Sequence, residues 1–185
     1  MSHHIYTTKA FIVHSSPHGE SGKFLLLFTS DFGMISATAQ GIRLAQSKLR
    51  YHIQDFSFTN VSIVRGKEVW RLTGAHEIVE SVKPSILHIK ILKLLKRLLH
   101  GEEKNEKLFG IIETLYRSEI KEEDYDNTEC LIVLRVLDAL GYISNKDLSI
   151  FLSDNSIDNE ILSKVKENKK GIINTINDSL KESQL

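Results

Sequence analysis

The sequence predicts an α+β protein in two segregated parts, an N-terminal all-β barrel over residues 1–80 and an all-α domain over residues 81–185. Up to about residue 80, the apolar residues come in short runs rich in β-branched and aromatic types, separated by turn signals, which is typical of strands. From Pro84 onward they recur at helical spacing. With 41% hydrophobic and 26% charged residues among 185, the chain can form one large core or two small ones. This composition excludes disorder as a description of the whole chain.

Five runs are expected as strands, at residues 6–14, 23–30, 33–40, 55–64 and 68–79. Turn residues predict a tight hairpin at residues 30–33, between the second and third runs, and another at 65–67, between the fourth and fifth. Alternation in the fourth run slips in phase near Asn60, which predicts a β-bulge there. Five short strands over about 75 residues fit a small, partly open Greek-key barrel. Hairpin geometry alone leaves an SH3-like barrel open.

The helical part begins at Pro84, because proline suits a first helical turn, where its missing N–H has no partner in any case. The first helix is expected to run to His100 and to end at Gly101. Further helices are expected at about residues 105–120, from a cap at Asn127 or Thr128 to Leu140, and at about 146–152, 158–168 and 172–182. In the helix that ends at Leu140 the residues expected to face inward are Leu131, Val133, Leu134, Leu137 and Leu140.

Charge is distributed unevenly along the chain. Basic and acidic residues both number 24, so the formal net charge is zero and any polyanion has to be held by a local patch. Segment 41–71 has six basic residues against two acidic ones, and segment 81–100 has five basic residues and no acidic one. Segment 102–129 has ten acidic residues against four basic ones. The two basic segments are therefore the candidate anion-binding surfaces.

The cations of segment 41–71 fall on predicted loops and hairpins, where they can bind phosphates while neighbouring aromatic rings stack on unpaired bases. The candidate rings are Tyr51, Phe56 and Trp70. The alternative interpretation is that Phe56 belongs to the core and that the charges form an ordinary solvated surface. Both interpretations stay open at this point.

Chemical motifs are sparse. Cys130 is the sole cysteine, which excludes an internal disulfide and a zinc site of paired cysteines, and its apolar helical surroundings indicate an inert buried thiol. His14 and His18 are four residues apart, but Pro17 between them indicates turn residues rather than a helix that would align two imidazoles on a metal. No phosphate-binding glycine loop, nucleophile elbow or metal-binding carboxylate motif is present. We therefore expect no enzyme, no metal and no other cofactor.

No stretch approaches the roughly 20 uncharged residues that span a bilayer, and the N-terminus lacks the pattern of a signal peptide, so a cytoplasmic protein is expected. The helix from Pro84 to His100 also has the basic and apolar faces of a membrane-surface helix. Packing in a bundle is favoured, because the later amphipathic helices need partners of their own. The basic face of this helix could pair with the acidic segment 102–129, bind DNA or receive an acidic peptide tail.

Several short motifs stand in a characteristic order and spacing. They are AFIV at residues 10–13, PHGES at 17–21, FT at 28–29, DFG at 31–33, AQG at 39–41, Arg43, SKLR at 47–50, QDF at 54–56 and WRL at 70–72. In this combination the chain resembles the DNA repair protein RecO family. The resemblance covers nearly all of residues 5–80, continues more thinly at 92–99, 108–109 and 134–142, and selects the OB-fold among the small barrels.

The resemblance implies a non-enzymatic recombination mediator, bacterial and nucleoid-associated. Such a protein binds single- and double-stranded DNA, anneals complementary strands and acts with RecR to displace single-strand-binding protein and load RecA. Annealing requires only that two polyanionic strands be brought together with their repulsion screened, which a basic groove can do. The positions that match DNA contacts are Arg43, Lys48 and Arg50, with Lys23, Arg65, Lys67, Trp70 and Arg71 as further candidates.

The chain also departs from the family pattern. Many members carry a four-cysteine zinc module after a Leu-Gly-Tyr stretch, whereas no cysteine follows Tyr142 here. The chain is shorter than typical members, so part of the helical domain is expected to be missing or reduced. In the family that domain receives the acidic, Phe-ending tail of single-strand-binding protein. Here the charge for such a site would come from Lys90, Lys93, Lys96 and Arg97, or from the cluster at 164–170.

Two other functions remain open at the level of sequence. The first is a protein-interaction adaptor on the same fold, in which DNA contact is vestigial. The near-neutral charge and the shortened helical half favour it. The second is an RNA-binding barrel, which competition between matched DNA and RNA oligomers would separate from a DNA-binding one.

Overall fold

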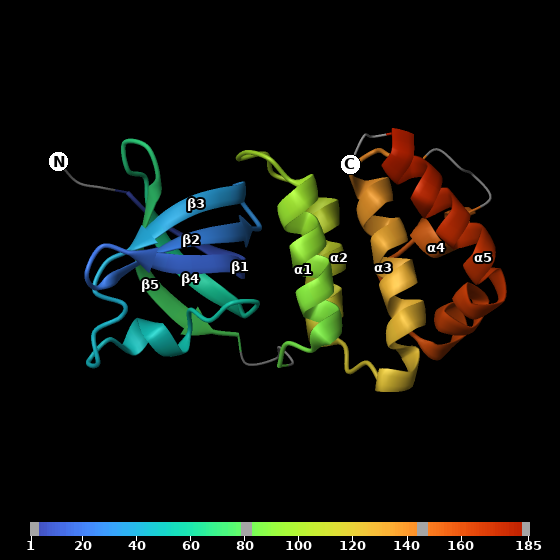
Figure 1. Cartoon of the computed structure of the whole chain (residues 1–185), viewed down its shortest axis with the longest axis horizontal. Helices are drawn as coiled ribbons and strands as arrows, with labels where there is room; N and C mark the ends of the chain where they lie inside the picture. The colour runs from blue at the N-terminus through green and yellow to red at the C-terminus, as the bar shows by residue number, and fades with distance from the viewer. Residues whose placement is uncertain (1–3, 79–82, 144–147, 183–185) are drawn as a thin grey trace. The chain divides into compact units, whose positions relative to one another are not determined.

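The computed structural model describes residues 4–78, 83–143 and 148–182 (Figure 1). The chain divides into two compact units: Met1–Pro84 with Leu99–Lys104, and Ser85–Leu98 with Asn105–Leu185. The first unit holds the strands and the second the helices, which confirms the predicted α+β class. The predicted domain boundary, between residues 80 and 81, lies outside the described residues. One feature was not predicted: the segment Leu99–Lys104 belongs to the β unit, although helices flank it on both sides.

The β unit is a closed five-stranded barrel. The strands are β1 (Ile5–His18), β2 (Gly22–Thr29), β3 (Gly33–Ala39), β4 (Phe58–Val64) and β5 (Trp70–Glu77), in the order β1-β2-β3-β5-β4. Neighbours are antiparallel except for β3 and β5, which are parallel. This order is that of an OB-like barrel, and both predicted hairpins are confirmed. The barrel is closed rather than partly open, because β1 is long enough to pair with β2 and with β4.

Alternation along the strands produces two apolar faces. The barrel core consists of side chains on the inward phase together with residues of the loop between β3 and β4. Its members are Ala10, Ile12, Leu25, Leu27, Ile35, Ala37, Ala39, Ile42, Ile53, Val61, Ile63, Trp70, Leu72 and Ala75. On the outward phase, Phe11 stacks on Phe58 with 4.3 Å between ring centroids, and all three rings of Phe11, Phe28 and Phe58 are buried. Burial of each such large side chain contributes about 1.5–3 kcal/mol to stability.

Two expectations for the strands are wrong. The turn expected around His14 and His18 is wrong, because β1 continues past His14, the end of the predicted run, and through Pro17 to His18. Among the described residues, only β2 pairs with this part of β1, so the missing N–H of proline is tolerated on the other edge of the strand.

The predicted bulge at Asn60 is also wrong, because Asn60 pairs regularly with Lys9 and His76. The register shifts lie elsewhere, between Ser62 and Ile63 in the pairing of β4 with β5 and near residue 13 in β1. The phase slip in the sequence has another cause. Thr59 takes an inward position, where its hydroxyl donates to the carbonyl of His76 (2.7 Å).

The helical unit contains α1 (Ile86–Leu98), α2 (Glu106–Arg117), α3 (Tyr125–Ala139), α4 (Ser149–Leu152) and α5 (Asn159–Glu182) (Figure 1). Asn105 caps α2, since its side chain accepts a hydrogen bond from the backbone N–H of Leu108 at 2.9 Å. The predicted caps Asn127 and Thr128 lie inside α3, which begins after Asp124. Thr128 is fully buried, so its side chain serves the packed face and not a helix end. Of the helix predicted at 146–152, residues 146 and 147 lie outside the described residues.

The two last predicted helices are one continuous helix, α5. Gly171, which falls between the two predicted ranges, lies on the exposed side of α5, where a glycine costs only about 1 kcal/mol relative to alanine. Val165, Ile172 and Ile176 are buried along one face and carry the helix through this point. Packing therefore overrides the local preference of glycine.

Helix α3 is the centre of the unit, since it contacts α1, α2, α4 and α5. Leu131, Leu134 and Leu137 are buried as predicted, whereas Val133 and Leu140 are only half-buried. A helix with neighbours on several sides buries more than one stripe. The further buried residues of α3 include Cys130, Ile132, Arg135 and Val136. Burial raises the pKa of the Cys130 thiol, in line with the inert thiol expected from the sequence. Among the described residues, no helix has the length and apolar character needed to span a bilayer.

Candidate nucleic-acid interface

Strand pairing aligns one row of side chains across the outer surface of the barrel. Leu25 and Leu27 of β2 point into the core, so the intervening phase, which includes Phe24, points outward. The register pairs Ser16 with Phe24, Phe24 with Thr38, and Thr38 with Arg71. An aromatic ring and a guanidinium group therefore lie two strands apart in the same row, roughly 10 Å at the usual strand spacing. Phe24 is half-buried and Arg71 is exposed.

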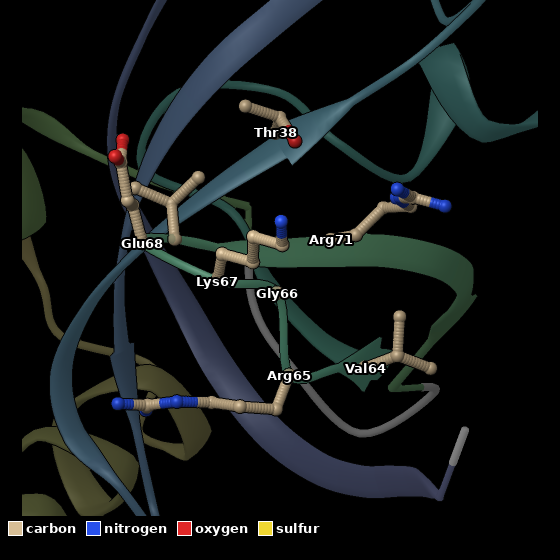
Figure 2. A pocket seen from close by; sticks show the side chains of 8 residues that line it. Thr38, Val64, Arg65, Gly66, Lys67, Glu68 and Arg71 are labelled. Carbon is tan, nitrogen blue, oxygen red and sulfur yellow. The ribbon is translucent and has the colours of Figure 1, made fainter. Parts of the chain in front are cut away.

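The loop between β4 and β5 adds a second cation beside this row. Together with Thr38 and Arg71 it encloses a hollow of about 650 Å³. Figure 2 shows the amine of Lys67 pointing toward Thr38, with Arg71 on one side and Glu68 on the other. Lys67 and Arg71 are both exposed. Their charges therefore remain available to a ligand that lies across β3 and the β4–β5 loop.

A second hollow, of about 390 Å³, lies at the turn between β1 and β2 and also includes Thr38 in its wall. Arg43 is fixed beside this turn: its backbone N–H donates to the carbonyl of Ser21 (2.9 Å) and its guanidinium donates to that of Gly19 (3.4 Å). The rest of its side chain is exposed. We call the outward residues of this region the Thr38 surface, comprising Phe24, Thr38, Arg43, Lys67 and Arg71.

Lys48 and Arg50 belong to a different cluster. They lie on the 3-10 helix η1 (Lys48–Tyr51), where the Arg50 guanidinium stacks 4.7 Å from the centre of the Tyr51 ring. Tyr51 is 62% exposed and lines a separate hollow of about 230 Å³ with His52. This hollow shares none of its described lining residues with the two that meet at Thr38. The structure thus divides the predicted DNA contacts between the Thr38 surface and an η1 cluster of Lys48, Arg50 and Tyr51.

Two of the predicted cations are already engaged by other residues. Lys23 is half-buried on the inward phase of β2, and its amine donates to the hydroxyl of Ser15 at 3.2 Å. The Ser15 hydroxyl in turn donates to Asp55. Arg65 forms an ion pair with Glu102 of the segment Leu99–Lys104. Neither cation therefore joins the Thr38 surface in this conformation.

Trp70, a predicted DNA contact, is buried in the barrel core. Trp70 is only 4% exposed, on the inward phase of β5, with its ring against Phe32 (4.8 Å between centroids) and Tyr6 (5.7 Å). Its indole N–H donates to Glu102 at 3.1 Å. Trp70 lies two residues before the apolar Leu72, and this alternate spacing is the signal that would have placed Trp70 inside the barrel. Phe24 is the ring that sequence reasoning missed, and alternation with Leu25 and Leu27 is the signal for it.

Phe56, the remaining candidate ring, is half-buried and has a left-handed φ of 67°. Its backbone N–H donates to the carbonyl of Ile12 (2.6 Å). This hydrogen bond pins the loop between β3 and β4 against β1. A positional role in the loop therefore accounts for Phe56 without a ligand.

On α1, one of the predicted partner-binding cations is paired. The Lys90 amine lies 2.5 Å from a carboxylate oxygen of Glu129 on α3, and this hydrogen bond raises the pKa of Lys90. Pairing with the acidic segment, one of the three uses left open by the sequence, is thus realised at Lys90. Lys93, Lys96 and Arg97 are exposed. The cluster on α1 that remains available to a partner consists of these three.

Comparison with known proteins bears on the N-terminal half most strongly. Residues 1–81 match the family model described as "Recombination protein O N terminal". A "DNA repair protein RecO" from Dehalococcoides mccartyi (strain ATCC BAA-2266 / KCTC 15142 / 195) is 37% identical over 75 residues, which cover 40% of this chain and 30% of the relative. That of Heliobacterium modesticaldum is 29% identical over 154 residues, 79% of this chain and 55% of the relative. That of Chlorobium limicola is 24% identical over 159 residues, 80% of this chain and 60% of the relative.

The chain thus spans between 30 and 60% of the length of these curated relatives. The match to the family model ends close to the end of the barrel. The alignments at 29% and 24% identity cover 79% and 80% of the chain and therefore continue into the helices. Residues 1–81 match the Recombination protein O N-terminal family model, and the resemblance of this chain to RecO is confirmed.

Proposed function

We propose that this chain is a DNA repair and recombination mediator that binds single- and double-stranded DNA through its barrel, promotes strand annealing and assists RecA loading with RecR. The observation that carries the proposal is the Thr38 surface. Three exposed cations, Arg43, Lys67 and Arg71, accompany an outward aromatic ring, Phe24, on the face and loops with which OB-folds bind oligonucleotides. The similarity to relatives described as "DNA repair protein RecO" favours DNA as the nucleic acid.

The chemistry of this surface suits a single strand. Exposed cations neutralise phosphates and release counterions, while an aromatic ring stacks on any base because every base has a π-face. Contacts of this kind leave the Watson–Crick edges of the bases free. Duplex DNA can be bound through the phosphate contacts alone, without stacking on its bases. The η1 cluster offers a further cationic site, where a second strand can be held with its repulsion screened.

Fluorescence anisotropy tests the binding step. A labelled single strand of about 16 nucleotides covers one OB-fold, and at about 0.1 M salt we expect micromolar or tighter binding that weakens steeply as salt rises. Annealing of complementary labelled strands, followed by energy transfer, is expected to be faster than the spontaneous reaction. Absence of binding at tens of micromolar protein would contradict the proposal. Equal competition by a matched RNA oligomer would favour the RNA-binding alternative.

The adaptor function has its own supporting observation, the exposed cations Lys93, Lys96 and Arg97 on α1. They fit an acidic peptide such as the tail of single-strand-binding protein, a contact that we propose for the helical unit. A labelled acidic peptide that ends in phenylalanine is the probe. Peptide binding that is lost when these three residues become alanine, together with no DNA binding, would favour the adaptor. Peptide binding together with DNA binding would favour the mediator.

A further inference from the structure

We propose that Glu102 is an internal competitor for DNA phosphate. Its carboxylate holds Arg65 away from the Thr38 surface, and a phosphate of bound DNA replaces this carboxylate as the partner of Arg65. This inference rests on the proposed DNA binding and deepens it. It adds a fourth phosphate ligand, Arg65, and names the group that occupies it in the free protein.

Two donors converge on the Glu102 carboxylate. The Arg65 guanidinium forms an ion pair with one oxygen, and the indole N–H of Trp70 donates to the other at 3.1 Å. The guanidinium also lies over the Trp70 ring, 4.8 Å from its centre. A guanidinium beside a second N–H donor suits any anionic oxygen, a phosphate as well as a carboxylate. The barrel thus carries an anion-binding pair that an acidic side chain of the same chain fills.

The segment that carries Glu102 is fixed to the barrel at a second place. Gly33, at the start of β3, has a φ of +66°, and a Cβ built on it would lie 2.1 Å from the carbonyl oxygen of Glu103. The backbone of Glu103 therefore lies directly on the glycine. This contact positions Glu102 opposite Arg65 and Trp70, even though the segment lies between α1 and α2 in sequence.

The ion pair can be exchanged. The side chains of Arg65 and Glu102 are 57% and 39% exposed, and exposed ion pairs are weak and screened by salt. Arg65 lines the same hollow as Lys67 and Arg71, but its guanidinium extends away from them (Figure 2). Rotation of the side chain alone would bring it toward that hollow. A single strand on the Thr38 surface offers a row of phosphates there, which can displace one carboxylate.

Substitution of Glu102 by glutamine tests this directly, with Glu103→Gln as the matched control. Both variants remove one negative charge from the same exposed segment, but only Glu102 contacts Arg65. One phosphate contact on a single strand adds about 0.7 to the salt slope, which corresponds to about fivefold in affinity at 0.1 M salt. We expect Glu102→Gln to bind the labelled strand about two- to fivefold more tightly, with a steeper slope, and Glu103→Gln to bind as the unchanged protein does.

A double variant assigns the gain to Arg65. If Glu102 acts through Arg65, then Arg65→Ala/Glu102→Gln should bind no more tightly than Arg65→Ala alone. Equal affinities of Glu102→Gln and Glu103→Gln, or a gain that survives in the Arg65→Ala background, would overturn the inference. If the unchanged protein and all variants fail to bind the strand, the proposed function itself fails. The two failures are therefore distinguishable.

The fluorescence of Trp70 provides a readout that does not depend on affinity. Trp70 is the only tryptophan of the chain, and its buried indole N–H contacts Glu102. Saturation with the strand should change the Trp70 emission of the unchanged protein toward that of free Glu102→Gln, at the concentrations where anisotropy rises. Emission that stays constant at saturation would show that the carboxylate stays in place, which overturns the inference.

Discussion

Replacement of Phe24 by alanine should weaken binding of single-stranded DNA without changing its dependence on salt. Base–aromatic stacking contributes about 1–3 kcal/mol per base, and each 1.4 kcal/mol is tenfold in affinity. Phe24 is half-buried, so only part of its ring can receive a base. Its partners across the sheet, Ser16 and Thr38, have short side chains, and the His18 imidazole lies 6.5 Å from the Phe24 ring between centroids. We therefore expect the lower part of the range, about 5- to 30-fold.

Leu26→Ala is the matched control for this prediction. Leu26 is the next outward residue of β2 and is half-buried like Phe24, so its truncation removes apolar area from the same face without removing a ring. Anisotropy titrations at several salt concentrations give the affinity and the slope, and thermal melts show whether each variant is folded. An unchanged affinity of folded Phe24→Ala would refute the reasoning. An equal loss in Leu26→Ala, or a change in salt slope, would refute it as well.

Two further predictions concern stability. Burial lowers the pKa of His88 below its usual 6.5, since desolvation outweighs the hydrogen bond to the Leu115 carbonyl. Below pH 6.5 His88 is therefore protonated to a greater extent in the unfolded chain than in the folded unit, so the free energy of unfolding should fall as pH falls. His88→Gln should flatten this dependence in urea melts, and an equally steep dependence would contradict the assignment. Gly33→Ala should lower the melting temperature more than Gly19→Ala. Both residues have a left-handed φ, for which alanine costs about 1–2 kcal/mol. Of the two, Gly33 alone lies against another backbone segment, so its substitution also creates a steric clash. Equal shifts would show that the segment carrying Glu103 does not lie on Gly33.

Local patterns were enough to predict the strands, the hairpins and most helices. Apolar spacing and turn residues act within a few positions, and the hairpins at residues 30–33 and 65–67 depend on nothing else. Errors arose where tertiary packing decides. Two helices were expected at 158–168 and 172–182, whereas buried residues on both sides of Gly171 keep one helix continuous. Thr128 is of a residue type that often caps helices, but it lies on the packed face of α3.

The candidate site was predicted by residue type but not by arrangement. The cations Arg43, Lys67 and Arg71 are exposed as expected, and their sequence neighbourhood is sufficient to find them. The inward position of Trp70 and the outward position of Phe24 follow from strand phase, which becomes certain only once the register is known. The contact between Arg65 and Glu102 joins residues 37 positions apart, and no local pattern indicates it.

The salt dependence of single-strand affinity tests the role of the Thr38 surface most directly. The decisive variant is Arg43→Ala/Lys67→Ala/Arg71→Ala, and the control is Lys166→Ala/Lys170→Ala/Lys181→Ala, which removes three exposed cations from α5. Each phosphate contact contributes about 0.7 to the slope of log affinity against log salt, so the first variant should lose about 2 from its slope. The control should keep the slope of the unchanged protein. Equal slopes in all three proteins would contradict DNA binding through this surface.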